Sequence, residues 1–129
     1  MTIAYLCILV VALLPFVWTV AAKSAGKRYD NRDPRAWLAK QENPRVHRAN
    51  SAQLNAFEAF PAFAASVLMA QLAGVNVQHI TWLALAFVAF RIGHGVFYVL
   101  GNHAARSAVW FGGFLCMLGL MVLAILAVG

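Results

Sequence analysis

The sequence has few charged residues, only two cysteines and none of the common catalytic motifs. Charged residues make up 11% of its 129 residues and hydrophobic residues 63%, a balance outside the range of ordinary soluble domains. Cys7 and Cys116 lie far apart in apolar stretches, without the spacing of a disulfide framework or a metal site. No Ser/His/Asp arrangement, Cys-x-x-Cys pair, phosphate-binding loop or dinucleotide fingerprint is present. We therefore expect a membrane protein with no metal site.

Long apolar runs predict four membrane-spanning helices within one domain, residues 1–129. The runs at 1–22, 79–101 and 107–128 are each long enough, at about 20 residues, to cross a ~30 Å hydrocarbon core. The stretch 48–73 contains polar residues, but it is the only segment able to make the return crossing. The expected fold is an all-α bundle of four transmembrane helices with a basic loop at 23–47.

The basic residues predict the orientation of this bundle. Eight of the ten Lys and Arg residues lie between Lys23 and Arg48, and Arg106 lies in the last short loop. Because cytoplasmic loops carry the positive charge, both basic loops are expected in the cytoplasm and both termini on the other side. Topology and attraction to anionic lipid explain the formal charge of +6 better than nucleic acid binding does.

The basic loop contains signals for a short helix of its own. Asp33 followed by Pro34 is a typical helix start, with the Asp as the cap and the Pro in the first helical position. A helix over 35–41 would place Trp37 and Leu38 in the membrane interface. Pro44 marks the start of the next helix.

Polar residues recur at helical spacing in the second and third predicted spans. In the second span, Arg48, Asn55 and Glu58 lie at i, i+7 and i+10. In the third span, a second set lies at i, i+3 and i+7. At 3.6 residues per turn, each set is expected to share one face. The second set is Arg91, His94 and Tyr98.

These two spans are antiparallel, so depth can be counted from the cytoplasmic boundary at 1.5 Å per residue. On that count Glu58 is level with Arg91, and Asn55 and Ser51 are level with His94 and Tyr98. A lone charge in mid-membrane is costly and normally pairs, which predicts a Glu58–Arg91 ion pair. Such a pair alone could serve only to fix helix register; the additional polar groups favour a polar pocket that opens toward the cytoplasm.

Two motifs carry a resemblance to a known family. The second span contains N-x-x-E-x-x-P, and the third contains R-x-x-H-x-x-x-Y-x-x-G followed by an Arg-Ser pair. Together they resemble the MAPEG superfamily, the membrane-associated proteins in eicosanoid and glutathione metabolism. The segment DNRDPRAWLAK of the basic loop is similar to a bacterial branch of mostly unassigned activity. The residues are Asn55, Glu58 and Pro61, then Arg91, His94, Tyr98 and Gly101, then Arg106 and Ser107.

The resemblance implies a homotrimer in a bacterial inner membrane that binds glutathione between protomers, near the cytoplasmic side. Glu58 would face the amino end of glutathione, and Arg106, Ser107 or Tyr98 would activate its thiol. The residues expected to contact glutathione or to shape its site are Arg48, Asn55, Glu58, Arg91, His94 and Tyr98.

The sequence also departs from the family pattern. Ser51 lies where the family usually has an Arg, and Gly93 lies where the leukotriene-forming synthase has an Arg thought to activate the thiol.

The leading hypothesis is a glutathione transferase or peroxidase that acts on a lipophilic electrophile. The alternatives are a non-catalytic membrane binding or scaffold protein with the same bundle, and a small ion or proton transporter built on Glu58 and Arg91. The apolar outer halves of both spans argue against the transporter.

Overall fold

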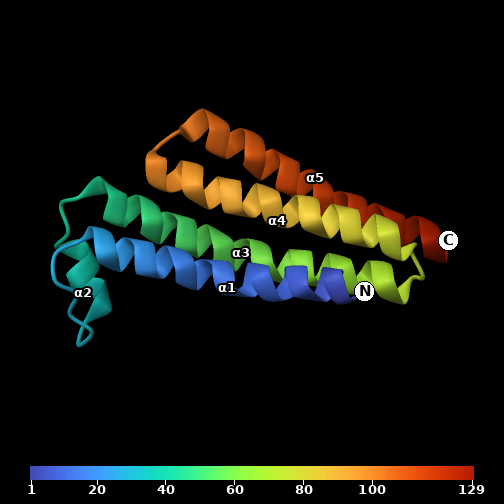
Figure 1. Ribbon diagram of the computed structural model, residues 1–129, viewed down its shortest axis with the longest axis horizontal. Helices are drawn as coiled ribbons and strands as arrows, with labels where there is room; N and C mark the ends of the chain where they lie inside the picture. Colours follow the sequence, from blue (N-terminus) through green and yellow to red (C-terminus); the bar gives the residue numbers. More distant parts are fainter.

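The computed structural model describes all 129 residues and contains only helices, four of them long. Figure 1 shows the long helices side by side along the molecule, with both termini and the α3–α4 turn at one end. The segment between α1 and α3, which contains α2 and which we call the connector, lies at the opposite end together with the α4–α5 turn. The helices are α1 (Thr2–Ala25), α2 (Pro34–Ala39), α3 (Pro44–Leu72), α4 (Val77–Leu100) and α5 (His103–Val128).

Capping residues set the helix boundaries near the connector. The Asp33 side chain accepts a hydrogen bond from the backbone N–H of Ala36 at 3.0 Å, with proline in the first turn of α2. The Asn43 side chain caps α3 in the same way, directly before Pro44. Gly101 ends α4 in the left-handed region, with φ of 78°, where glycine carries no steric penalty. The predicted short helix is thus present, although it ends two residues before the predicted Gln41.

An apolar core fills the half of the bundle nearer the chain termini, which we call the terminal half. Each long helix contributes three buried residues at the i, i+3/i+4 spacing of one helix face. The rings of Phe63 and Phe87 stack near the middle of the bundle, with centroids 4.0 Å apart. The twelve core residues are Ala4, Cys7 and Val11; Phe63, Val67 and Ala70; Ile80, Ala84 and Phe87; and Cys116, Leu120 and Ala124.

Three helices are long and apolar enough to cross a membrane: α1, α4 and α5. The fourth long helix, α3, is the longest at 29 residues, but its polar residues keep it out of this class. It nevertheless packs against α1, α4 and α5 alike. Large apolar side chains cover the outside of the bundle, including Leu9, Trp82 and Leu126, as expected for a protein surrounded by lipid. The chain is therefore an integral membrane protein.

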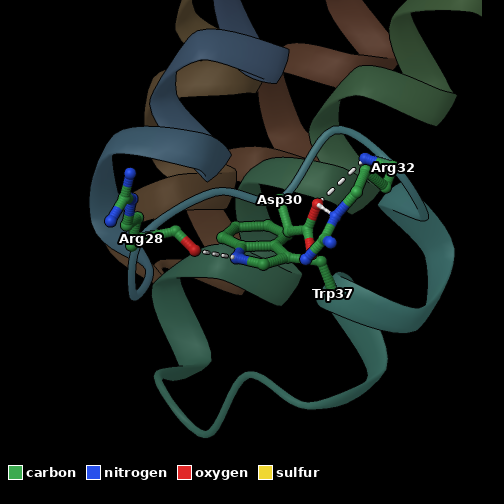
Figure 2. Close-up of polar contacts among 4 residues, drawn as sticks. All are labelled: Arg28, Asp30, Arg32 and Trp37. Carbon is green, nitrogen blue, oxygen red and sulfur yellow. Dashed lines mark hydrogen bonds and ion pairs between the residues drawn. The ribbon is translucent and has the colours of Figure 1, made fainter.

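The connector folds back onto the bundle around Trp37, which is buried (Figure 2). Its indole Nε1 donates hydrogen bonds to the backbone carbonyls of Arg28, at 3.0 Å, and Lys27, at 3.3 Å. A Cβ atom at Gly26 would lie 2.6 Å from the Trp37 ring, so this contact needs a glycine. The prediction that Trp37 dips into the membrane interface is wrong, because the indole N–H finds backbone partners inside the protein instead.

Candidate functional site

Two adjoining pockets lie between α3, α4 and α5. The first, which we call the polar pocket, has a volume of about 220 Å³ and is lined by Asn55, His94, Tyr98, Arg106, Ser107 and Trp110. The second, the apolar pocket, has a volume of about 250 Å³ and is lined mainly by Ala59, Ala62, Phe87, Trp110, Phe114 and Met117, together with Asn55, Glu58 and Arg91. Asn55 and Trp110 belong to both pockets. Each pocket alone is smaller than the roughly 300–1,000 Å³ common for small-molecule sites, whereas the two joined reach that range.

The wall of the polar pocket is formed by three side chains that stack on one another. His94 and Tyr98 follow each other by one turn of α4, and their rings meet edge to face with centroids 5.5 Å apart. The Arg106 guanidinium of α5 lies over the Tyr98 ring, 4.4 Å from its centroid, a favourable cation–π contact. The Tyr98 hydroxyl makes no hydrogen bond with another residue, so it remains free to donate one into the pocket.

Arg91 is buried at the bottom of the site and pairs with an amide, contrary to prediction. Its Nη2 donates a 2.8 Å hydrogen bond to Oδ1 of Asn55. The expected Glu58–Arg91 ion pair is absent, because no Glu58 oxygen lies within 4.0 Å of the guanidinium. The only ion pair in the chain joins Arg32 and Asp30.

The geometry of α3 explains why Glu58 has no partner. Asn55 and Glu58 are three residues apart, which is about 300° of helical rotation and leaves Glu58 about 60° round from Asn55. Asn55 is half-buried against α4, whereas Glu58 is exposed at the rim of the apolar pocket. Glu58 and Arg91 line the same apolar pocket, but the direction of Asn55 around the α3 axis makes Asn55, and not Glu58, the hydrogen-bond partner of Arg91.

His94 carries an unsatisfied polar atom. Its side chain is buried, and Nδ1 has no hydrogen-bond partner. Buried polar atoms are almost always paired, and leaving one unpaired costs on the order of 1–3 kcal/mol. The free Tyr98 hydroxyl, in contrast, belongs to a residue that lines the polar pocket, where a ligand would complete its hydrogen bonding.

Two residues from the predicted polar face lie outside both pockets. Arg48 donates from Nε to the backbone carbonyl of Val99 at 3.0 Å, and its guanidinium covers Gly101 at the end of α4. It therefore ties α3 to the last turn of α4. Ser51, predicted to be level with Tyr98, lines neither pocket.

Trp110 is a site residue that the sequence analysis did not identify. It lines both pockets, and its ring stacks on Phe114 with centroids 5.3 Å apart. The signal was available in the spacing, because Arg106, Trp110 and Phe114 lie at i, i+4 and i+8 on one face of α5. That face passes from cationic to aromatic as it runs from the polar pocket to the apolar pocket.

The fold and the site together define the class of this protein. It is an integral membrane protein of the helical-bundle type, with a cationic, hydrogen-bonding pocket that adjoins an apolar one. A model of the MAPEG family matches residues 2–126, and the chain therefore belongs to this family, which includes glutathione-dependent enzymes. A search of curated proteins and a search of solved structures each found no match.

Proposed function

We propose that the protein binds glutathione and is a transferase or peroxidase that acts on a lipophilic electrophile. The observation that carries the proposal is the junction of the two pockets at Asn55 and Trp110. A hydrophilic thiol and an apolar acceptor need two environments side by side, and the joined pockets offer both. The family membership adds support, because glutathione-dependent enzymes are among its members.

The charges of the site match those of glutathione. Glutathione carries two carboxylates, which guanidinium groups recognise in bidentate fashion, and one ammonium group, which a carboxylate recognises. The site offers Arg91 and Arg106 for the carboxylates and Glu58 for the ammonium group. Asn55 and His94 add hydrogen-bonding groups to the lining of the polar pocket.

The thiolate is the reactive form of glutathione, so catalysis requires a group that favours deprotonation. Tyr98 and Arg106 are suited to this as a unit, because the guanidinium over the ring adds positive charge where the hydroxyl can donate a hydrogen bond to sulfur. Ser107 lies in the same pocket and is the alternative donor. The thiolate sulfur would then bond to the electrophilic carbon, and the leaving group would depart with the electron pair.

The exposure of Glu58 supports an assembly in which a second copy covers this face. A carboxylate left exposed in mid-membrane is costly, and Glu58 lies near the middle of α3, exposed at the rim of the apolar pocket. We propose that α3 is a fourth membrane span and that the protein is a homotrimer with the site between protomers. The even number of spans agrees with both termini lying at one end of the bundle (Figure 1). With the basic connector in the cytoplasm of a bacterial cell, both termini would face the outer side of the inner membrane.

A non-catalytic binding or scaffold role is the second candidate. It is favoured by Gly93, which adds no side chain at the position where one branch of the family has an activating Arg. The residues around Gly93 are apolar, with Val109 3.8 Å and Phe97 3.9 Å from where a Cβ atom would lie. This candidate predicts glutathione binding without conjugation.

Calorimetry and a conjugation assay on the purified protein test the proposed glutathione binding and the proposed catalysis together. We expect glutathione to bind to the wild type and an aryl halide to be conjugated. The ultraviolet absorbance of bound thiolate, followed against pH, assigns the activating group. The thiol titration should move to higher pH in the variant that lacks this group: Tyr98→Phe, Arg106→Gln or Ser107→Ala. Arg45→Gln on the connector side is the control and should not move it. No glutathione binding by folded wild type would refute the proposal; binding without conjugation would favour the scaffold role.

A further inference from the structure

A third pocket lies on a different side of the bundle, between α1, α2 and α3 at the connector end. It has a volume of about 210 Å³ and shares no lining residue with the candidate site. Its polar lining consists of Thr19 and Lys23 from α1, Arg35 from α2, and Asn50 and Gln53 from α3. We call it the connector pocket.

The connector pocket is cationic and has no carboxylate in its lining. Lys23 and Arg35 make no ion pair, and Lys23 is held in place over the Tyr29 ring, 4.1 Å from its centroid. The two acids that adjoin its lining residues in the sequence, Asp30 and Asp33, are engaged elsewhere. Asp30 binds the Arg32 guanidinium (Figure 2), and Asp33 caps α2.

The walls of the connector pocket are ordered by the fold rather than by a ligand. Trp37 forms one wall, and its indole is fixed to the backbone carbonyl of Arg28 (Figure 2). Tyr29 packs edge to face on Trp37, with ring centroids 5.1 Å apart. The side-chain amides of Asn50 and Gln53, which line the pocket from α3, bond to no other residue, so both can donate hydrogen bonds into the pocket.

An exposed aromatic pair continues the connector pocket toward the membrane. Phe16 precedes Thr19 by three residues on α1, and Phe57 follows Gln53 by four on α3, so both lie one turn closer to the middle of the bundle. Their rings meet edge to face with centroids 5.8 Å apart, and they are 57% and 44% exposed. A polar, cationic pocket at the helix ends thus leads directly to an apolar surface at membrane depth.

We propose that the connector pocket binds the headgroup of an anionic phospholipid, with its phosphate between Lys23 and Arg35 and its acyl chains along Phe16 and Phe57. Lys and Arg near a membrane surface attract anionic lipid, and Arg and amide groups add directed hydrogen bonds to phosphate oxygens. The aromatic pair selects a lipid over free phosphate, because a free anion would leave that apolar surface without a partner. The proposal does not rest on glutathione binding, since the two sites share no lining residue within one protomer.

Native mass spectrometry of the detergent-solubilised protein tests the proposal. Phosphatidylglycerol and phosphatidylcholine with identical acyl chains are added in turn, and the bound lipid is counted. We expect a preference for phosphatidylglycerol of roughly tenfold or more from two cations near the surface, lost in the Lys23→Gln/Arg35→Gln double variant. The Lys40→Gln/Arg45→Gln double variant is the matched control, because it removes the same charge from the same end outside the connector pocket, and it should keep the preference.

Two further measurements complete the test. Arg35→Lys keeps the charge and should keep most of the preference, which separates electrostatic binding from a fold defect. Inorganic phosphate at millimolar concentration should not displace the lipid, because it lacks acyl chains. Equal binding of the two lipids by wild type, equal loss in both double variants, or displacement by phosphate would each overturn the proposal.

Discussion

The two halves of the bundle differ in the side chains that they bury and in how completely these are partnered. In the terminal half, four helices contribute three apolar residues each, and the side chains of Phe63, Ile80 and Leu120 have almost no exposed surface. In the other half, which we call the polar half, Arg91 and His94 are equally buried. Arg91 has one hydrogen bond, and an atom of His94 has none. The terminal half is complete within one chain, whereas the polar half is left with groups that still need partners.

This difference assigns stability to one half and binding to the other. Apolar residues packed at van der Waals distance hold helices together in lipid, where the hydrophobic effect between helices is weak. Unpaired donors and charges reduce stability unless a ligand or a second copy pairs with them. Substitutions in the terminal half should therefore alter unfolding, and substitutions in the polar half should alter binding.

The largest expected effect is on stability, from Leu120→Ala in the terminal half. Leu120 is fully buried, and truncation would leave a cavity in the core where α5 packs against α3 and α4, at a cost of roughly 2–3 kcal/mol. Leu126→Ala is the matched control on the same helix, because Leu126 is 72% exposed and should change stability by less than about 0.5 kcal/mol. Equilibrium unfolding in mixed detergent micelles measures both, and equal losses would contradict the assignment of the core.

The second prediction concerns the boundary between the halves, where α1 crosses α4 at Gly95. A Cβ atom there would lie 2.0 Å from the Trp18 ring, so Gly95→Ala must push α1 away and should cost on the order of 1–3 kcal/mol. Gly93→Ala, two residues earlier, is the control. Its Cβ would lie no closer than 3.8 Å to another side chain, an ordinary contact.

Thermal unfolding of the two glycine variants checks this boundary. We expect Gly95→Ala to unfold at a lower temperature and Gly93→Ala to match the wild type. If Gly93→Ala were as unstable as Gly95→Ala, close packing against Trp18 would not be what distinguishes the two positions.

The helix boundaries near the connector were predictable, since local signals at Asp33, Pro34 and Pro44 decide them. The motif residues His94, Tyr98, Arg106 and Ser107 also lie around one pocket, as their spacing indicated. The partner of Arg91 could not be predicted, because counting rise along the helix gives depth but not direction around its axis. Trp37 was misplaced for a related reason: a pattern of interfacial residues cannot show that the chain will fold back to offer two carbonyls.

The third prediction separates binding from stability in the polar half. Arg91→Met removes a buried cation and leaves Oδ1 of Asn55 without its donor. Because Asn55 is only half-buried and lines both pockets, the loss of stability should stay at about 0.5–1.5 kcal/mol. If Arg91 binds a carboxylate of glutathione as proposed, affinity should fall roughly tenfold or more, since hydrogen bonds to charged groups contribute about 1.5–3 kcal/mol. Calorimetry measures the affinity, and unfolding in mixed micelles measures the stability.

Arg45→Met on the exposed start of α3 is the control for charge removal and should leave both quantities unchanged. A variant that lost stability in proportion to affinity would show that Arg91 holds the helices rather than the ligand. The contrast between the two halves would then fail at its most buried charge.

The smallest expected effect lies in the connector, outside both halves, where Asp30 and Arg32 form the ion pair. The Arg32 guanidinium donates to the Asp30 carboxylate and holds the pKa of that carboxyl below its usual range. A lowered pKa contributes stability above the unfolded-state pKa, and this contribution is lost as the pH falls through the folded-state pKa. The pair is solvent-exposed and screened by salt, so we expect acid to change the connector while the unfolding of the bundle stays constant.

NMR titration of Asp30 measures its pKa directly. Arg32→Gln should raise this pKa toward the ordinary value of about 3.9. Arg28→Gln should not, because the Arg28 side chain does not contact Asp30 (Figure 2). Unfolding that followed the Asp30 titration would mean that the connector, and not only the terminal half, sets the stability of the bundle.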